Sequence, residues 1–164
     1  MTEQSLSTGS VLHPGEGTSY WFMGSLVTVK VGGAQTRNRL TVIDFLNPAG
    51  FTPPLHRHLK EDECFYVLSG SARFRCDDQT FEAHEGDVVF LPVGSAHSFK
   101  VLGDEPLRTL QITVPAGFEE FADEAGEPAQ EAVLPAPGPV DEEAMTAAAA
   151  RHDIEILGPP PADL

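Results

Sequence analysis

The sequence contains few positively charged residues. Ten Lys and Arg stand against 25 Asp and Glu among 164 residues, which gives a formal net charge of −15 at pH 7. A surface with this balance repels the phosphates of nucleic acids and of anionic lipids. We therefore expect neither a nucleic acid nor a membrane as a partner.

Long apolar runs and cysteines are also scarce. No segment approaches the roughly 18 apolar residues that a membrane-spanning helix needs, and the first residues, MTEQSLSTGSVLHPGEG, lack the basic start and apolar stretch of a secretory signal. We therefore expect a cytoplasmic protein. Cys64 and Cys76 are too few for a disulfide framework, so we expect free thiols.

From about residue 18 to residue 115, the sequence is a series of short segments rich in Val, Ile, Phe and Thr. Clusters of Gly, Pro, Asn and Asp separate them, which is typical of an all-β sandwich or barrel. The length and the 41% hydrophobic content suit one domain with appendages. The expected strands are residues 25–31, 39–46, 55–59, 64–69, 72–76, 79–84, 87–92, 97–102 and 107–114.

The composition changes after Pro115. Apolar residues follow helical spacing over residues 118–125, and Gly126 is placed to end this helix. Residues 127–139 contain four prolines and favour an extended linker. Acidic residues followed by strong helix formers predict a second helix at about 141–152.

These patterns divide the chain into three parts. We expect an N-terminal leader at residues 1–17, a β-barrel at 18–115 and a helical, proline-rich extension at 116–164. The apolar segment IEIL follows the second expected helix, and such a segment is usually buried against a neighbour. We therefore expect the extension to pack on the barrel.

Two histidines stand one residue apart in PLHRHLKEDECFYVLSG, residues 54–70. In a strand, His56 and His58 point to the same face, about 6 to 7 Å apart, so both can contact one ion. Three carboxylates follow in the segment EDE, and a bend or bulge across residues 59–62 would turn Glu63 to the same face. Each of these polar residues, taken singly, is more often a solvent-exposed strand residue.

A hairpin is expected at Ser69 and Gly70, which suit a two-residue turn. In that register Glu63 lies opposite Cys76, whereas Cys64 and Cys76 face opposite sides of the sheet. A disulfide between the two cysteines is then not expected, and Cys76 becomes a neighbour of the histidine site.

Two motifs in the sequence resemble those of the cupin superfamily. The first has the spacing of Gly50, His56, His58, Glu63 and Gly70, and the second that of Gly86, Pro92, Gly94 and His97. One position differs, because Val101 stands where the second motif often has Asn. The resemblance covers about residues 18–115 and implies a cupin jelly-roll β-barrel with short C-terminal helices.

The resemblance also implies a metal site. The ligands of one divalent transition metal ion would be His56, His58, Glu63 and His97. Motif spacing selects Glu63 over Glu61 and Asp62, which we expect to face solvent. Three imidazoles and one carboxylate suit Ni, Mn, Fe, Co, Cu or Zn and leave one or two coordination positions open.

A narrower resemblance concerns the segments GTSYWFMGSLVTV, VPAGFEEF and AARHDIEILGPPP. They are similar to bacterial single-domain cupins grouped with quercetin 2,3-dioxygenases. This resemblance implies an oxidoreductase that cleaves a flavonol or related enolisable aromatic with dioxygen, with Glu63 as the catalytic base. A metal-dependent isomerase or cyclase and a non-enzymatic small-molecule-binding cupin are the alternatives.

The substrate side of the site is less specific. Phe65, Phe74 and Phe99 share the face of the metal ligands and would give the apolar walls that an aromatic substrate requires, although each also suits an ordinary barrel core. The aromatic segment at residues 20–23 is expected to seal the end of the barrel. We expect the protein to form a homodimer.

Overall fold

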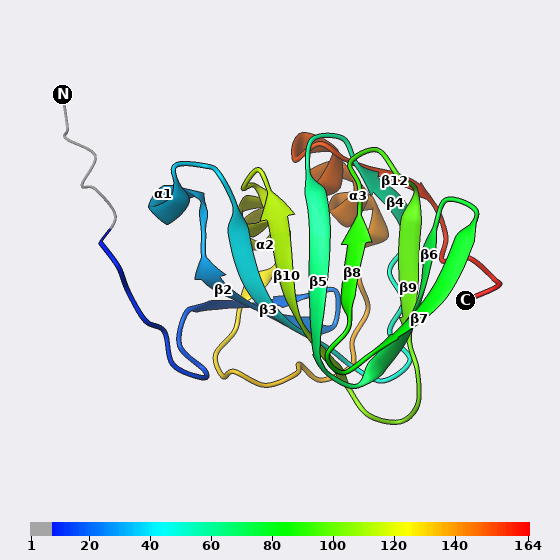
Figure 1. Ribbon diagram of the computed structural model, residues 1–164, viewed down its shortest axis with the longest axis horizontal. Helices are drawn as coiled ribbons and strands as arrows, with labels where there is room; N and C mark the ends of the chain where they lie inside the picture. The colour runs from blue at the N-terminus through cyan, green and yellow to red at the C-terminus, as the bar shows by residue number, and fades with distance from the viewer. Residues whose placement is uncertain (1–7) are drawn as a thin grey trace.

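The computed structural model describes residues 8–164 and shows two antiparallel sheets that face each other (Figure 1). One sheet has the strand order β11-β1-β2-β3-β10-β5-β8, and the other has the order β12-β4-β9-β6-β7. The expectation of an all-β barrel with short C-terminal helices is confirmed. No helix within the described residues is long and apolar enough to cross a bilayer.

All nine expected strands are present, with ends within two residues of the predicted ones. The strands β1, β11 and β12 were not predicted as strands. The bounds are β1 Thr18–Phe22, β2 Ser25–Val31, β3 Thr41–Asn47, β4 Leu55–His58, β5 Asp62–Ser69, β6 Ser71–Cys76, β7 Gln79–His84, β8 Val88–Leu91, β9 His97–Val101, β10 Leu107–Val114, β11 Glu127–Pro128 and β12 Ile154–Gly158.

Three short helices complete the described structure: α1 Gly33–Thr36, α2 Phe118–Ala125 and α3 Glu142–Arg151. The helix α2 ends at Gly126, as its sequence indicates. The side chain of Asp141 caps α3, because its Oδ1 accepts a hydrogen bond from the backbone N–H of Ala144 at 3.0 Å. The sequence did not predict α1.

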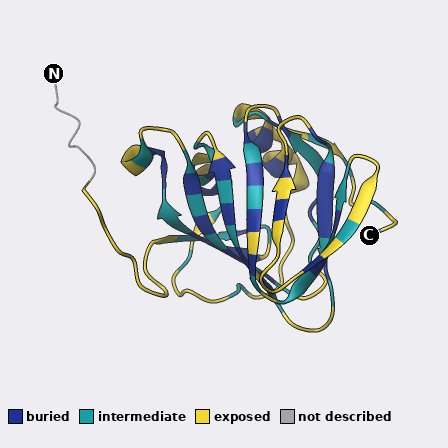
Figure 2. Ribbon diagram, in the orientation of Figure 1, coloured by how far each residue is buried: buried dark blue, intermediate teal, exposed yellow. Residues whose placement is uncertain are grey.

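Buried and more exposed residues alternate along the strands, and the buried ones form the core between the sheets. In β3 and β10 every second residue is buried, so one side of each strand faces the interior (Figure 2). One apolar cluster joins the inner side of β1, β2 and β3 to α2, α3 and β12. A second lies between β5 and the sheet formed by β6 and β9. The barrel interior is therefore packed at one end and lined by the C-terminal helices at the other.

The C-terminal extension is built into the barrel. The apolar tail expected to dock forms β12, which pairs antiparallel with β4 and sets Ile154 beside His58 and Ile156 beside His56. The strand β11 pairs with β1, and α2 and α3 lie behind the strands in the view of Figure 1. The extension thus supports the strand that carries the two histidines.

The predicted hairpin at Ser69 and Gly70 is wrong. The strand β5 pairs with β10 and β8, whereas β6 pairs with β7 and β9 in the other sheet. Gly70 has a φ of +82°, and a Cβ there would lie 2.6 Å from the carbonyl oxygen of Pro106. Its lack of a side chain lets the chain cross between the sheets at this point.

The cysteines are free thiols, as the sequence predicts. Cys76 is the register partner of His97 on the neighbouring strand. It is therefore close to the histidine site, but through β9 and not through the expected pairing with Glu63.

Candidate metal centre

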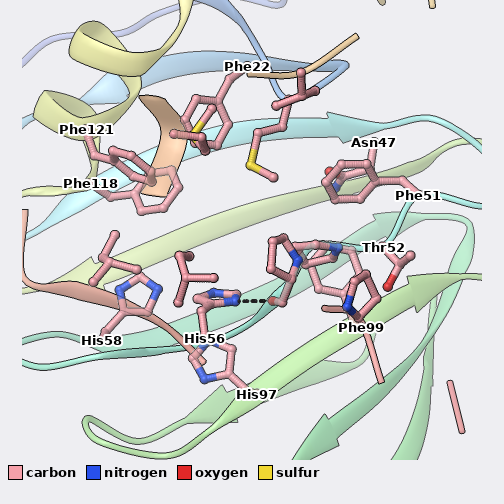
Figure 3. A pocket seen from close by; sticks show the side chains of 18 of the residues that line it. Phe22, Asn47, Phe51, Thr52, His56, His58, His97, Phe99, Phe118 and Phe121 are labelled. Atoms are coloured by element: carbon pink, nitrogen blue, oxygen red, sulfur yellow. Dashed lines mark hydrogen bonds between the residues drawn. The ribbon is translucent and has the colours of Figure 1, made fainter. Parts of the chain in front are cut away.

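Four side chains converge inside the barrel from three strands: His56 and His58 from β4, Glu63 from β5 and His97 from β9. One ligand atom of each lies within 4.8 Å of those of the other three. His56 and His97 are register partners, which brings the two motifs together. Figure 3 shows the three histidines side by side.

The expected change of phase between His58 and Glu63 is present. The strand β4 ends at His58, residues 59 and 60 form an exposed bend, and β5 starts at Asp62. The bend is fixed because the backbone N–H of Leu59 donates to the carbonyl of Asp153 at 2.8 Å. Glu63 consequently points inward and is only 3% exposed.

Each imidazole is oriented by a hydrogen bond at its Nδ1 atom. The bonds are 2.8 Å from His56 to the carbonyl of Pro54, 2.8 Å from His58 to Oε2 of Glu61 and 3.0 Å from His97 to the carbonyl of Ser95. Carbonyl and carboxylate oxygens only accept, so each Nδ1 carries the hydrogen. The lone pair of each neutral ring is then on Nε2, the atom available to a metal.

Three of the converging atoms are buried without a hydrogen-bond partner in the described chain: Nε2 of His58, Nε2 of His97 and Oε2 of Glu63. The Oε2 atom of Glu63 lies 3.0 Å from Nε2 of His97 and 3.6 Å from Nε2 of His58. Buried polar atoms without partners are costly and uncommon in native proteins. A cation bound between them would satisfy all three, so the cluster could hold a metal ion.

The electrostatics of the cluster favour the ligand forms of Glu63 and His56. Burial alone would raise the pKa of Glu63, but the neighbouring His58 and His97 outweigh it and lower the pKa to about 2. Burial, with His97 and His58 nearby, lowers the pKa of His56 to about 3. Burial also opposes the charged form of His58, yet Glu63 and Glu61 raise its pKa overall. At neutral pH Glu63 is therefore a carboxylate and His56 a neutral imidazole.

Gln111 fixes the carboxylate, and the sequence analysis missed it. It lies on β10 opposite Phe65, is 2% exposed, and its Nε2 donates a hydrogen bond to Oε1 of Glu63. The other carboxylate oxygen, Oε2, is left to face the imidazoles. A polar residue at an inward position of an otherwise regular strand, in LRTLQITV, was the available signal.

The expectation that Glu61 faces solvent is wrong. Its side chain turns inward, is 7% exposed, and accepts the hydrogen bond from His58. The second oxygen, Oε1, lies against Gly117, where a Cβ would be 2.6 Å away. Asp62 is half-buried and accepts a hydrogen bond from the backbone of Val93 at 2.9 Å. The three carboxylates of EDE thus have three different contacts.

A cavity of about 540 Å³ adjoins the four converging side chains. Aromatic side chains form much of its wall, among them Phe22, Phe51, Phe65, Phe99, Phe118 and Phe121. Figure 3 shows Phe118 and Phe121 on one side of the histidines and Phe51 and Phe99 on the other. Phe22 and Met23 belong to the segment expected to seal the barrel end, and they line this cavity as well.

Phe74, grouped by sequence with Phe65 and Phe99, does not line the cavity. It is 0% exposed and packs behind these two, with ring centroids 5.7 Å from Phe65 and 5.2 Å from Phe99. Phe74 therefore belongs to the barrel core. The substrate role predicted for Phe65 and Phe99 stays a prediction.

The C-terminal extension forms one wall of the cavity. Phe118 of α2 stacks on the ring of His58 at 6.1 Å between centroids, and Met145 of α3 and Ile156 of β12 also contribute. Glu142 and residues 159–160 line the cavity and are exposed, so the opening to solvent lies at the extension.

Comparison with known proteins finds a match to a known domain over part of the chain. Residues 43–113 match the profile of the cupin domain. An uncharacterized protein of Methanocaldococcus jannaschii is 31% identical over 68 residues, which are 42% of this chain and 54% of that protein. An oxalate-binding protein of Thermotoga maritima is 31% identical over 67 residues, 41% of this chain and 55% of that protein. The chain spans about half the length of these two relatives.

The fold comparison agrees with the sequence match. The crystal structure of a predicted oxalate decarboxylase from Thermotoga maritima superposes with a TM-score of 0.58 at 19% identity, over 64% of this chain and 99% of that one. None of these three proteins is named as a quercetin dioxygenase. The finer resemblance to quercetin dioxygenases therefore stays a prediction, whereas residues 43–113 match the cupin-domain profile and the two antiparallel sheets have the arrangement typical of the cupin double-stranded β-helix.

Proposed function

We propose that the protein is a metal-dependent dioxygenase of the quercetinase type, which cleaves a flavonol or another enolisable aromatic compound with dioxygen. The observation that carries the proposal is the position of the metal centre in the wall of a largely aromatic cavity. A structural metal site is usually closed by its protein ligands, whereas a catalytic one keeps a position open toward its substrate.

The donor set supports catalysis of this kind. Four protein ligands leave one or two positions free on a five- or six-coordinate ion. When bound, a divalent ion supplies Lewis-acid polarisation and lowers the pKa of a hydroxyl group that coordinates it. The chain's own residues supply the shape of the cavity, the orientation of the ligands and the acceptor for a proton.

Glu63 is the proposed proton acceptor. Its carboxylate is ionised, and Gln111 holds Oε1 while Oε2 faces the imidazoles of His97 and His58 without a hydrogen-bond partner in the described chain. A hydroxyl group of a substrate that reaches the metal centre lies within reach of Oε2, which takes up its proton. Phe65 and Phe99 flank the remaining space and can hold a flat ring by stacking.

The cavity wall favours an aromatic compound over a small dianion such as oxalate. No Lys or Arg is among the described residues that line it, and the exposed Glu142 lies at its rim. A dianion would have to leave water for a wall with little to balance its charge. A flat apolar ring gains from burial against the phenylalanines.

The test begins with metal content and oxygen uptake. The purified chain is analysed for transition metals, reconstituted with each of Ni, Mn, Fe, Co, Cu and Zn, and supplied with quercetin and simpler enolisable aromatics in an oxygen electrode. We expect a bound metal and oxygen consumption that depends on it. The variant His58→Ala should lose both, whereas the exposed His84, 64% accessible, can be replaced by Ala without loss.

Two results would count against the proposal. A protein that binds no transition metal even after reconstitution has no functional metal centre. A protein that binds metal but consumes no oxygen with any of these compounds is not a dioxygenase of this class, and a metal-dependent isomerase or a small-molecule carrier would replace it.

A further inference from the structure

Gln111 has one hydrogen-bonding atom that no residue of the described chain uses. The side chain points inward from β10, is 2% exposed, and belongs to the wall of the metal-site cavity. Its Nε2 donates to Oε1 of Glu63, whereas its own Oε1 is buried without a hydrogen-bond partner. A buried amide oxygen without a partner costs free energy. The donor that would offset this cost has to come from a molecule in the cavity.

The orientation of the Gln111 amide follows from its contact with Glu63. A carboxylate oxygen only accepts hydrogen bonds, so the amide group presents its N–H to Glu63. A rotated amide would place two oxygen acceptors against each other and would lose this bond. The Oε1 atom of Gln111 is therefore fixed as an acceptor, which favours a ligand group that donates and disfavours one that only accepts.

The neighbouring inward residues of β10 do not supply the donor. Thr109 and Thr113 lie on either side of Gln111 along the strand and are 0% exposed. Their hydroxyl oxygens are also buried without a hydrogen-bond partner, so neither hydroxyl bonds to Gln111. Among the described residues that line the metal-site cavity, Gln111 is present and the two threonines are not. Of these three residues, only Gln111 is placed where a ligand in that cavity can contact it.

The free acceptor lies beside the candidate metal centre. Glu63 connects the two, because its Oε1 is held by Gln111 and its Oε2 lies 3.0 Å from Nε2 of His97. Phe65 is the register partner of Gln111 and also lines the cavity, so a ring that stacks on Phe65 carries its substituents past Gln111. When one hydroxyl of such a ring reaches the metal centre, the group on the neighbouring ring atom is placed to contact Oε1 of Gln111.

We propose that Gln111 determines the substrate class by accepting a hydrogen bond from a hydroxyl or amino group next to the hydroxyl that binds the metal. The inference rests on the proposed function and narrows its substrates to ortho-dihydroxy and ortho-aminohydroxy aromatic compounds. In the 3-hydroxy-4-ketone unit of a flavonol the corresponding neighbour is a carbonyl oxygen, which accepts and does not donate. A site with a buried acceptor discriminates strongly against this mismatch, because the acceptor then stays unpaired.

The test compares two ligands of similar size on one protein. The zinc-reconstituted chain is titrated by calorimetry with catechol and with 2-methoxyphenol, in which a methyl group replaces the second donor hydrogen. We expect the wild type to bind catechol more tightly. Gln111→Met keeps the length of the side chain and removes the acceptor, so it should lower the ratio of the two affinities by about 10-fold. Because the ratio is taken within each variant, an effect of Gln111 on metal binding through Glu63 cancels.

Thr109→Val is the matched control, because it removes an unpartnered hydroxyl from the same strand at a position outside the cavity wall. It should leave the ratio of affinities unchanged. Gln111→Asn, which draws the amide back by one methylene, should act as Gln111→Met does and replaces it where that variant does not fold. A ratio equal to that of the wild type in the Gln111 variants would overturn the proposal.

The titration needs no dioxygen, so the two proposals can fail separately. A protein with the expected change of ratio that consumes no oxygen would refute the dioxygenase activity and keep the role of Gln111 in binding. A protein that consumes oxygen with quercetin and shows the same ratio in the wild type and in Gln111→Met would refute the substrate class alone.

Discussion

Two residues outside the four-residue cluster hold the candidate metal centre in position. Glu61 binds Nδ1 of His58, whereas His56 and His97 bind backbone carbonyls through the same atom. His58 is therefore the one histidine of the cluster that is oriented by a carboxylate, which makes its Nε2 a stronger donor. Gln111 has the corresponding role for Glu63.

Replacing Glu61 by Gln should weaken metal binding by about 10- to 100-fold. The amide preserves the size of the side chain, but it removes the negative charge that strengthens His58 as a ligand. Competition with a chromophoric chelator measures the change for Zn²⁺ or Co²⁺. Glu85→Gln is the control, because Glu85 is exposed. Equal affinities of the two variants would show that Glu61 does not tune the site.

The inward position of the Glu61 side chain requires a residue without a side chain at position 117. It has a φ of +157°, and a Cβ would lie 2.6 Å from Oε1 of Glu61. Gly117→Ala should therefore lower the free energy of unfolding by about 1–3 kcal/mol, as measured by urea denaturation. The control is Gly138→Ala, where the nearest atom is 4.0 Å away. A loss no larger than that of the control would mean that Glu61 moves aside without cost.

The residue-scale errors of the sequence analysis have a common physical cause. Motif spacing identified the four residues that converge, because strand parity and the bend at residues 59–60 are local properties. It could not show that Glu61 turns inward, since that depends on the space left by Gly117, which is far away in the sequence. Gln111 was missed because its contact with Glu63 depends on the pairing of β10 with β5, which the sequence did not predict.

At the scale of elements, alternation predicted the strands but not their partners. All nine expected strands formed near their predicted ends because periodicity and turn residues are encoded locally. The strand β6 pairs with β7 and β9 and not with β5, because closing two sheets into a barrel overrides the expected hairpin between β5 and β6. The short strand β12 was expected only as a docked tail, since its pairing with β4 is a contact between the two ends of the chain.

The strand β12 should contribute to the metal site through β4. Ile154 is 3% exposed, packs in the cluster with α2 and α3, and is the register partner of His58. Ile154→Ala should cost about 2–5 kcal/mol of stability and also weaken metal binding, because β4 loses support at its edge. Denaturation and chelator competition measure the two effects. Leu157→Ala, at a 39% exposed position of the same strand, should change neither.

A decrease in stability without any change in metal affinity would contradict this coupling. It would mean that β4 keeps its geometry through β9 alone, with which it shares the His56–His97 pair.

At the scale of the whole molecule, the candidate metal centre lowers the stability of the barrel interior. The centre contains buried polar atoms without hydrogen-bond partners in the described chain, and its carboxylate is ionised between imidazoles. An interior of this kind is less stable than an apolar one until a cation is bound. The sequence indicated the ligands, but nothing in it selects the metal or the substrate, because those choices depend on sub-ångström geometry and on the shape of the whole cavity.

Metal binding should therefore stabilise the entire fold. A ligand that binds only the native state at about 1,000 times its Kd adds about 4 kcal/mol, which for a chain of this size corresponds to a rise in Tm of roughly 8–16 °C. Calorimetry of the chelator-stripped protein before and after reconstitution measures the shift. His58→Ala should unfold at the same temperature with and without metal, because its cluster lacks one nitrogen ligand. An equal shift in His58→Ala and in the wild type would place the stabilising metal at some other site.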